Sequence, residues 1–306
     1  MFERRSAKKH RRPKPTAIRE LLRQAERRFK AAKLSYGHGT DNARDEAAFL
    51  ILEGLRLPID RLAPVLDWKL TAAERERLDE LIDARIATRK PAAYLLHRAY
   101  VGGVPFYVDE RVIVPRSFIA EIMQGPMLAA LAGDPASIRR VLDLCTGSGC
   151  LAVLAARAFP NATIDATEIS ADALAVARRN VDEHGLAARI RLLEGDLFAR
   201  VAAERYDLIL ANPPYVDAPA MSSLPPEYRH EPALALAGGT DGLALVRRIL
   251  AEAPAHLTER GGLLCEVGRG KPRLETEFPV PFLWLDTAAS TGEVFWLDAK
   301  SFRARP

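Results

Sequence analysis

The sequence predicts an α/β protein in which a Rossmann-like, doubly wound sheet follows a small helical domain and a β-hairpin. Three observations lead to this prediction. Strand-like and helix-like segments alternate from residue 141 onward. A glycine-rich turn separates the first of these strands from the helix after it. Before residue 99, the apolar residues follow helical spacing.

Three helices are predicted in the first part of the chain. The first runs from Thr16 to Lys33 and the second from about Asn42 to Leu55. The third begins at Thr71, which forms a capping box with Glu74, and ends before Pro91. The residues expected on the buried faces of the first and third helices are Ile18, Leu21, Leu22, Ala25, Phe29, Leu78, Leu81, Ile82 and Ile86. We expect residues 16–98 to form a helical domain that recognises the substrate.

Residues 99–116 are rich in β-forming side chains and predict a hairpin that links two domains. Its strands are expected in Tyr100–Val108 and Arg111–Val114, with the turn at Asp109-Glu110. A single helix over 117–132 is expected next, at the start of a catalytic domain that spans 117–306.

The alternation after residue 140 predicts a parallel sheet with helices on both faces. The expected strands are Val141–Leu144, Thr163–Thr167, Ile190–Leu193, Leu208–Ala211, Gly262–Val267, Phe282–Leu285 and Glu293–Leu297. The expected helices are Cys150–Ala158, Ala171–Glu183 with Ser170 as its N-cap, and Leu243–Leu257.

Composition places the chain among globular proteins: 48% of its 306 residues are hydrophobic and 27% are charged. No apolar run is long enough to span a bilayer, and the three cysteines predict reduced thiols, so we expect a cytoplasmic protein. The histidines lack ligand spacing, and no metal is expected. We expect a monomer.

The basic residues are concentrated at the start of the chain. Residues 1–15 carry seven lysines and arginines against a single acidic residue, Glu3, whereas the whole chain has a net charge of +4. Such a segment is typical of a flexible, solvated tail. It is also typical of an arm that contacts RNA, and the two interpretations are compatible.

The glycine-rich turn predicts a nucleoside cofactor. Asp143-Leu144-Cys145 leads into Thr146-Gly147-Ser148-Gly149, where the absence of Cβ atoms lets the backbone approach a ligand. Ala152 breaks the G-x-G-x-x-G pattern of dinucleotide enzymes, which favours the more compact S-adenosyl-L-methionine. Glu168 ends the next strand, where a carboxylate can accept both ribose hydroxyls.

Two further residues follow the third strand. Asp196 is expected to accept a hydrogen bond from the exocyclic amine of the adenine, and Leu197 is expected to pack on the ring. An ordinary turn is the alternative interpretation of this segment.

Asn212-Pro213-Pro214-Tyr215 follows a strand and predicts a site for a planar NH2 group. Two prolines stiffen the turn and leave its carbonyl oxygens free to accept. The Asn212 side-chain oxygen and the Pro213 carbonyl can then take both hydrogens and aim the nitrogen lone pair at a methyl donor. Tyr215 can pack on the planar group. The motif contains no evident general base.

These segments resemble the HemK/PrmB group of protein glutamine-N5 methyltransferases, within the class I S-adenosylmethionine-dependent methyltransferases. The resemblance covers roughly residues 16–300. It rests on Pro91–Leu95, Val114–Arg116, Asp143–Gly149 and Asn212–Tyr215, and most specifically on YGHGTDN (36–42), YVDERVIVPR (107–116), NPPYVD (212–217) and EYRHEP (227–232). These last segments are most similar to members that methylate the third large-subunit ribosomal protein. The resemblance implies that the Asn-Pro-Pro-Tyr turn binds the target glutamine.

The resemblance also implies that Thr146–Gly149, Glu168, Asp196 and Leu197 hold the cofactor. Glu168 stands where the group usually has Asp, and the extra methylene is compatible with ribose binding. The segment Tyr228–Pro232 is expected to wall the substrate pocket, with His230 as the histidine nearest the chemistry, or else to be a surface loop. Arg116 is expected to form a structural ion pair or to contact substrate.

Three other functions stay open from the sequence. The same reaction could modify a translation release factor. Adenine-N6 methylation of nucleic acid fits the same motif, although no second domain rich in aromatic and basic residues is present to read a flipped base. A module that binds S-adenosyl-L-methionine or RNA without catalysis is the third alternative.

Overall fold

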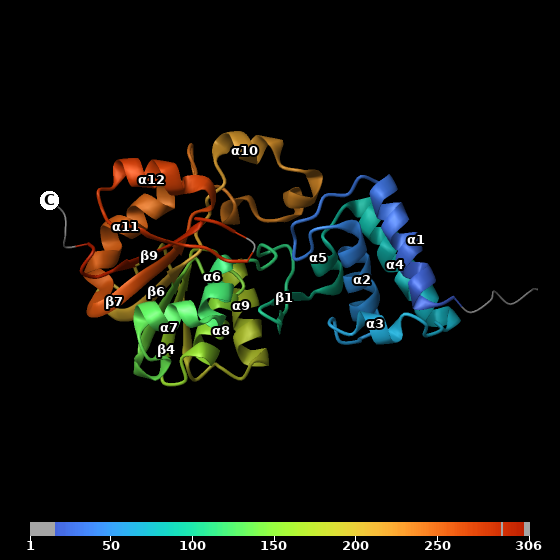
Figure 1. Cartoon of the computed structure of the whole chain (residues 1–306), viewed down its shortest axis with the longest axis horizontal. Helices are drawn as coiled ribbons and strands as arrows, with labels where there is room; N and C mark the ends of the chain where they lie inside the picture. Colours follow the sequence, from blue (N-terminus) through green and yellow to red (C-terminus); the bar gives the residue numbers. More distant parts are fainter. Residues whose placement is uncertain (1–15, 289, 303–306) are drawn as a thin grey trace, which may run out of the picture. The chain divides into compact units, whose positions relative to one another are not determined.

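The computed structural model describes residues 16–288 and 290–302, so the basic segment 1–15 lies outside the described residues. The chain divides into two compact units (Figure 1). The helical unit contains the residues up to Tyr36 together with Thr40–Ala92. The catalytic unit contains Gly37–Gly39 and the residues from Ala93 onward.

The helical unit is built on the three predicted helices. They are α1 (Ile18–Ala31), α2 (Ala43–Gly54) and α4 (Ala72–Thr88), with a short α3 (Leu62–Val65) between the last two. All five apolar residues predicted on the face of α1 are buried. Asn42 caps α2, and the Thr71–Glu74 capping box begins α4 as predicted.

The buried face of α4 differs from the prediction at three positions. Leu78 and Ile82 are buried, but Leu81 and Ile86 are half-buried. Arg85 is fully buried instead, with its Nε donating to Glu46 at 3.1 Å and its other nitrogens donating to the carbonyls of Ser35 and Arg89. Because a buried charge needs a partner, these contacts explain how an arginine replaces an apolar residue there.

The predicted hairpin is present, but its turn was placed wrongly. The strands are β1 (Ala99–Val101) and β2 (Val104–Phe106), and the turn is Gly102-Gly103 rather than Asp109-Glu110. Residues 111–114 form no strand because their backbone groups are used elsewhere. The Tyr94 hydroxyl donates to the Val112 carbonyl, and the Val114 amide donates to the Glu231 carboxylate at 2.9 Å. A short helix, α5 (Ala92–Leu96), precedes the hairpin.

The catalytic unit contains a seven-stranded sheet in the order β5-β4-β3-β6-β7-β9-β8. The strands are β3 (Arg140–Leu144), β4 (Thr163–Glu168), β5 (Ile190–Glu194), β6 (Tyr206–Ala211), β7 (Leu257–Glu266), β8 (Leu283–Leu285) and β9 (Val294–Asp298). β3 to β7 are parallel, as predicted, but β9 is antiparallel to both of its neighbours. The order reverses between β3 and β6, so the topological switch point of the sheet lies there.

Helices cover both faces of this sheet (Figure 1). One face carries α6 (Phe118–Gln124), α7 (Pro126–Ala132), α8 (Cys150–Ala158) and α9 (Ala171–Glu183). The other carries α11 (Ala244–His256) and α12 (Lys271–Glu277). The single helix predicted over 117–132 is two helices, because Gly125 adopts an extended conformation that ends α6 and Pro126 begins α7. The short α10 (Ala218–Ser223) follows the Asn-Pro-Pro-Tyr turn.

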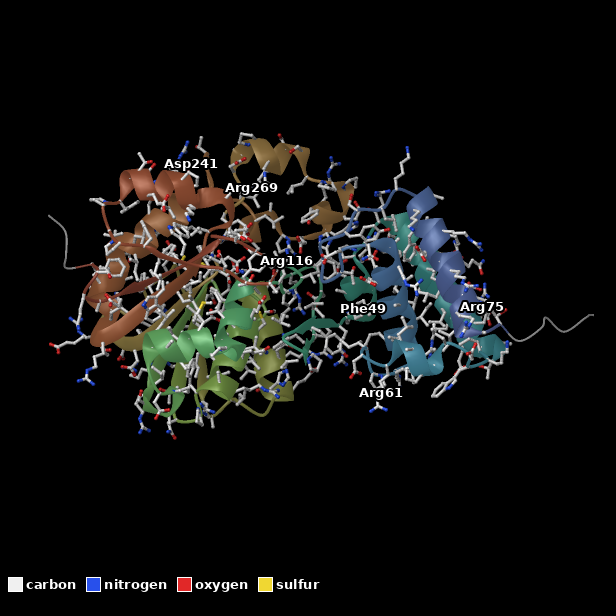
Figure 2. All side chains as sticks on the ribbon, in the orientation of Figure 1. Phe49, Arg61, Arg75, Arg116, Asp241 and Arg269 are labelled. Carbon is white, nitrogen blue, oxygen red and sulfur yellow. The ribbon has the colours of Figure 1, made fainter. Side chains whose placement is uncertain are left out.

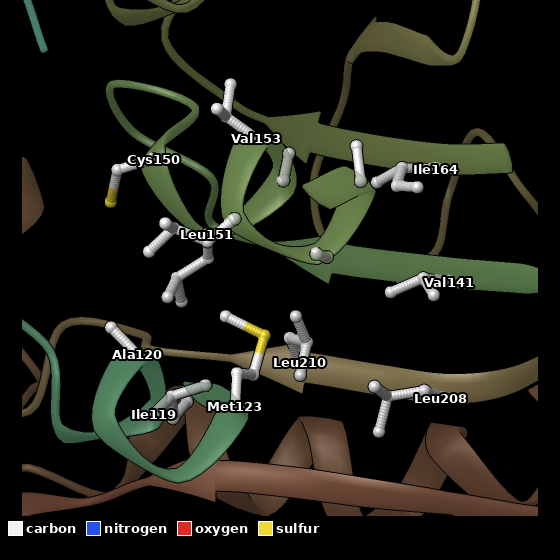
Figure 3. Packing of buried hydrophobic residues seen from close by; sticks show 14 of the residues in the cluster. Ile119, Ala120, Met123, Val141, Cys150, Leu151, Val153, Ile164, Leu208 and Leu210 are labelled. Carbon is white, nitrogen blue, oxygen red and sulfur yellow. The ribbon is translucent and has the colours of Figure 1, made fainter. Parts of the chain in front are cut away.

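Strand residues alternate between the two faces, which fixes the register of the core. Leu208 and Leu210 belong to the cluster beneath α6 and α8, whereas Ile209 and Ala211 belong to the cluster beneath α11. Figure 3 shows Met123 of α6 pointing toward Leu210. Each such large apolar side chain contributes about 1.5–3 kcal/mol through its removal from water. This packing holds the ends of β3 and β6 rigidly side by side.

Candidate functional site

The predicted site residues meet at one edge of the sheet. The glycine-rich turn follows β3, Glu168 ends β4, Asp196 follows β5 and Asn212 follows β6. Because these strands are parallel, their carboxyl ends lie at the same edge. The turn and Asn212 follow the two strands that flank the switch point, which is where open α/β sheets bind ligands.

A cavity of about 220 Å³, the first cavity, lies at this edge. Its lining includes eight of the predicted site residues: Thr146, Gly147, Ser148, Glu168, Asp196, Leu197, Asn212 and Pro214. Sequence reasoning did not identify Cys145, Ile169 and Arg248, which also line it. Ile169 is 53% exposed, and its apolar side chain is the kind of surface on which a planar ring packs.

The glycine-rich turn is shaped by left-handed backbone. Cys145, Gly147 and Gly149 have φ angles of 56°, 54° and 79°. A Cβ on Gly149 would lie 3.2 Å from the Cβ of Ala177, so only glycine lets the start of α8 pack this closely on α9. Asn180 supports the turn from below, because its Nδ2 donates to the Ser148 carbonyl at 2.8 Å.

The Glu168 carboxylate is fixed at the wall of the first cavity. Its Oε2 accepts from the Gly147 amide and its Oε1 from the Ser170 amide, both at 3.0 Å. A carboxylate has about four acceptor positions, so two stay available for hydroxyl groups of a ligand. Glu168 therefore has the geometry predicted for a ribose-binding residue.

Asp196 contacts a residue that the sequence did not indicate. The Arg248 guanidinium donates to both Asp196 oxygens, at 3.1 and 3.0 Å. Both side chains are about half exposed, so this pair contributes little to stability. Each oxygen keeps a second lone pair for a ligand amine. Arg248 lies on α11, 52 residues away in sequence, and no local pattern connects the two.

Asp143 lies behind the turn and does not line the first cavity. Its side chain is buried, and it accepts a hydrogen bond from the Thr146 hydroxyl. Burial raises the pKa of Asp143 to about 7, even though the Thr146 hydrogen bond lowers it. Its place in the structure is that of a support for Thr146.

The Asn-Pro-Pro-Tyr turn is held at both ends. The Asn212 Nδ2 donates to the Arg116 carbonyl at 3.3 Å, which leaves Oδ1 as the acceptor end of the carboxamide. The Tyr215 hydroxyl donates to Glu266 Oε1 at 2.9 Å. Burial and the nearby Glu266 carboxylate raise the pKa of Tyr215, so its hydroxyl stays protonated.

Glu266 was missed from the sequence, although it ends the parallel strand β7 next to β6. It also accepts from the Ser117 hydroxyl at 2.7 Å and the Phe118 amide at 3.0 Å, at the start of α6. Burial raises the pKa of Glu266, opposed by the hydrogen bonds from Ser117 and Tyr215. An acidic residue at the carboxyl end of a neighbouring strand was the signal that could have identified it.

A second cavity, also of about 220 Å³, is lined by the turn as well. It is lined by Ile113, Arg116, Asn212, Pro213, Pro214, Tyr215, Val216, Leu224, Tyr228, Ala235 and Leu236. The two cavities share Asn212 and Pro214, together with Ile113, Arg116 and Ala235. The predicted catalytic turn therefore borders both cavities, which are neighbours.

Arg116 forms the structural ion pair that was one of its two predicted roles (Figure 2 labels this residue). It lines both cavities, and its guanidinium donates to the two oxygens of Glu231 at 2.6 and 2.7 Å. Burial would raise the pKa of Glu231, but Arg116 and then His38 hold it at about 2.

Of the segment 228–232, Tyr228 lines the second cavity and Pro232 lines the first, as expected for a pocket wall. The prediction for His230 was wrong. His230 lines neither cavity. The histidine beside Glu231 is His38, whose Nε2 lies 3.6 Å from Glu231 Oε2.

The chain is similar to several characterised proteins. The model of the methyltransferase small domain matches residues 127–224. Ribosomal protein uL3 glutamine methyltransferase from Bradyrhizobium diazoefficiens is 54% identical over 92% of this chain and 90% of that protein. The proteins of the same name from Bordetella pertussis and Burkholderia pseudomallei are 52% and 50% identical, over 92% and 94% of this chain and 94% and 96% of theirs.

Among solved structures, a methyltransferase from Pyrococcus furiosus has 19% identity and a TM-score of 0.47, covering 71% of this chain and 97% of that one. The matches to the curated relatives extend over nearly the whole chain at half identity or more, and they confirm the predicted methyltransferase fold and chemistry. The chain belongs to the family of ribosomal protein uL3 glutamine methyltransferases.

Proposed function

We propose that this enzyme transfers a methyl group from S-adenosyl-L-methionine to the side-chain amide nitrogen (N5) of a glutamine in ribosomal protein uL3. The observation that carries the proposal is the pair of cavities that meet at Asn212 and Pro214. A methyl transfer needs a donor and an acceptor nitrogen held in line with each other, and the two neighbouring cavities could hold them on the shared residues. The choice of uL3 as the substrate follows from the relatives, which are uL3 glutamine methyltransferases.

The first cavity fits the cofactor. The Glu168 carboxylate, fixed by two backbone amides, would accept the ribose hydroxyls. Thr146, Gly147 and Ser148 would face the methionine-bearing side, and Asp196, Leu197 and the exposed Ile169 would surround the adenine. When bound there, S-adenosyl-L-methionine supplies a methyl group activated by a sulfonium sulfur. Asp143 would act indirectly, by holding Thr146.

The second cavity fits the acceptor glutamine. Asn212 Oδ1 and the Pro213 carbonyl would each accept one hydrogen of the substrate amide, which directs its nitrogen toward the first cavity. The bond from Asn212 Nδ2 to Arg116 fixes the carboxamide in the orientation that presents the oxygen. The bond to Glu266 fixes the Tyr215 ring beside the same group. Orientation of this kind contributes to catalysis without a general base.

We assign recognition of the rest of the substrate protein to the helical unit. The catalytic cavities accommodate a side chain and leave most of a protein substrate to other surfaces. Residues 16–98 were predicted as a recognition domain, and the structure describes a compact helical unit up to Ala92.

The test is a methyl-transfer assay with labelled S-adenosyl-L-methionine and three acceptors: uL3, a translation release factor and a naked adenine-containing nucleic acid. We expect one methyl on a glutamine of uL3, located by mass spectrometry. Replacement of Asn212 by alanine should lower kcat by a factor of about 10² or more, because the acceptor amide is no longer oriented.

The matched control is Asn161→Ala, which removes the same side chain from an exposed site where it donates to the Ala136 carbonyl. It should retain wild-type activity. Label on the release factor or on adenine would replace uL3 as the substrate. Full activity of Asn212→Ala would refute the role assigned to the turn, and no label on any acceptor would leave a binding protein.

A further inference from the structure

The segment Gly37–His38–Gly39 contacts the wall of the second cavity. In sequence it interrupts the helical unit, yet its contacts group it with the catalytic unit. The His38 side chain is 1% exposed, and its ring lies 4.3 Å from the Tyr228 ring, centroid to centroid, at an angle of 50°. Tyr228 lines the second cavity. The segment therefore packs directly behind a residue that the acceptor would touch.

Four side chains contact one another in a cluster beside the second cavity: His38, Glu231, Arg116 and Tyr228. The His38 Nε2 lies 3.6 Å from Glu231 Oε2, and Glu231 binds Arg116 through two hydrogen bonds. The Arg116 guanidinium lies 5.6 Å from the centre of the Tyr228 ring, and Tyr228 in turn contacts His38. The Glu231 side chain is fully buried, so movement of the Arg116 guanidinium would leave its charge poorly compensated.

This cluster is connected to Asn212 through Arg116. The carbonyl of Arg116 accepts the hydrogen bond that orients the Asn212 carboxamide. Glu231 Oε1 also accepts from the Val114 amide at 2.9 Å, so one carboxylate binds the backbone before Pro115 and the side chain of Arg116 after it. A displacement of Glu231 would therefore shift the acceptor wall and the residue that orients the acceptor amide.

Gly37 shows that the contact with Tyr228 leaves no spare room. Its φ is +112°, and a Cβ built on it would lie 2.5 Å from the Tyr228 hydroxyl oxygen. Neither ring nitrogen of His38 has a hydrogen-bond partner among the described residues. Buried side-chain nitrogens without a hydrogen bond are uncommon in folded proteins, and the position of this ring therefore needs an explanation.

We infer that Gly37 and His38 are positioning residues for the acceptor, which hold Tyr228 and the Glu231–Arg116 pair in the shape that admits the substrate glutamine. This inference rests on the proposed function of the second cavity. It adds a determinant of acceptor binding that comes from a segment about 190 positions before Tyr228 in the sequence. The first cavity does not include any of Gly37, His38, Glu231 or Tyr228 in its lining.

The experiment measures steady-state methylation of uL3 by the full chain and, separately, the Kd for S-adenosyl-L-methionine by calorimetry. For His38→Ala we expect KM for uL3 to rise about tenfold, the size of effect that follows from loss of one buried contact, with little change in the Kd of the cofactor. Thermal unfolding of each variant reports whether the fold is intact.

Gly37→Ala is the second variant, and Gly39→Ala is its matched control. Both positions have positive φ, +112° and +93°, so both variants carry backbone strain, but a Cβ on Gly39 would meet nothing within 4 Å. We expect Gly37→Ala to raise KM for uL3 and Gly39→Ala to leave it unchanged.

An unchanged KM in folded His38→Ala and Gly37→Ala proteins would overturn the inference, and so would an equal rise in Gly39→Ala. A parallel loss of cofactor affinity would also overturn it, because the effect would then not belong to the acceptor. If wild-type enzyme failed to methylate uL3, the proposed function would fail first, and the two failures are thus distinguishable.

Discussion

Asp143 illustrates how a residue in a ligand-binding motif can act from behind the site. The sequence placed it with the cofactor-binding residues, but its carboxyl is buried and holds the Thr146 hydroxyl. Burial raises its pKa from 3.8 to about 7. The folded protein therefore binds a proton that the unfolded chain releases, over the range between these two values.

This pKa shift predicts how stability depends on pH. Below about pH 4 the carboxyl is protonated in both the folded and the unfolded state, so it does not lower the free energy of unfolding. From about pH 4 to about pH 7 the free energy of unfolding falls as pH rises. Above about pH 7 the carboxyl is ionised in both states, and the free energy of unfolding falls no further on its account. Asp143→Asn removes this titration while the carboxamide oxygen can still accept from Thr146.

We expect Asp143→Asn to gain stability relative to wild type between pH 4.5 and pH 7.5, by on the order of 2 kcal/mol. The measurement is urea unfolding across this range, with the same substitution at the exposed Asp60 as control. Parallel stability curves for wild type and Asp143→Asn would contradict the raised pKa.

At the scale of elements, the Asn-Pro-Pro-Tyr turn depends on the loop that closes over it. The Val216 amide donates to the Leu236 carbonyl at 2.9 Å, and the Gly238 amide donates to the Val216 carbonyl at 2.8 Å. Gly242 has a φ of +79°, and a Cβ on it would lie 2.4 Å from the Tyr215 carbonyl oxygen. The loop after the turn thus fits only if this position lacks a side chain.

Gly242→Ala should therefore impair catalysis beyond its effect on stability. Gly133 is a fair comparison, because its φ is +83° and a Cβ there meets nothing within 4 Å. Both alanine variants should lose about 1–3 kcal/mol, because both positions have a positive φ that alanine rarely adopts. Only Gly242→Ala should also lose activity, by roughly tenfold or more, because it displaces Tyr215. Kinetics and denaturant unfolding of the two variants side by side decide this. Equal activity of the two would mean that the loop adapts without moving the turn.

Sequence periodicity predicted most of the elements, because helices such as α1 repeat apolar residues at helical spacing and the central strands, buried on both faces, are short apolar runs. The failures occurred where a choice depended on distant partners. Residues 111–114 have strand-like composition, but the Val114 amide bonds to Glu231, 117 positions away. Likewise, His230 was expected to be the histidine nearest the chemistry, yet His38 is the one that approaches Glu231. Local pattern contains no information about such pairs.

At the scale of the whole molecule, charge is divided unevenly along the chain. Residues 1–15 have seven basic residues and one acidic residue, a net charge of +6. Since the whole chain has +4, the remaining residues have a net charge of −2. Long-range attraction to a polyanion would therefore depend on this segment, which lies outside the described residues.

We predict that residues 1–15 bind RNA and are dispensable for methyl transfer to free uL3. The full chain should bind a single-stranded RNA oligonucleotide with a Kd that weakens steeply with salt, at a slope of about 0.7 per phosphate neutralised. Deletion of residues 1–15 should abolish most of that slope, because the rest of the chain is slightly acidic. A variant with the seven basic residues replaced by glutamine separates charge from length and should behave like the deletion. Binding is measured by fluorescence anisotropy between about 50 and about 300 mM salt, a range over which screening increases. Methylation of uL3 is measured at each salt concentration.

An unchanged slope after deletion would place RNA binding elsewhere on the enzyme, and a loss of methylation of free uL3 would show that the segment contacts the protein substrate.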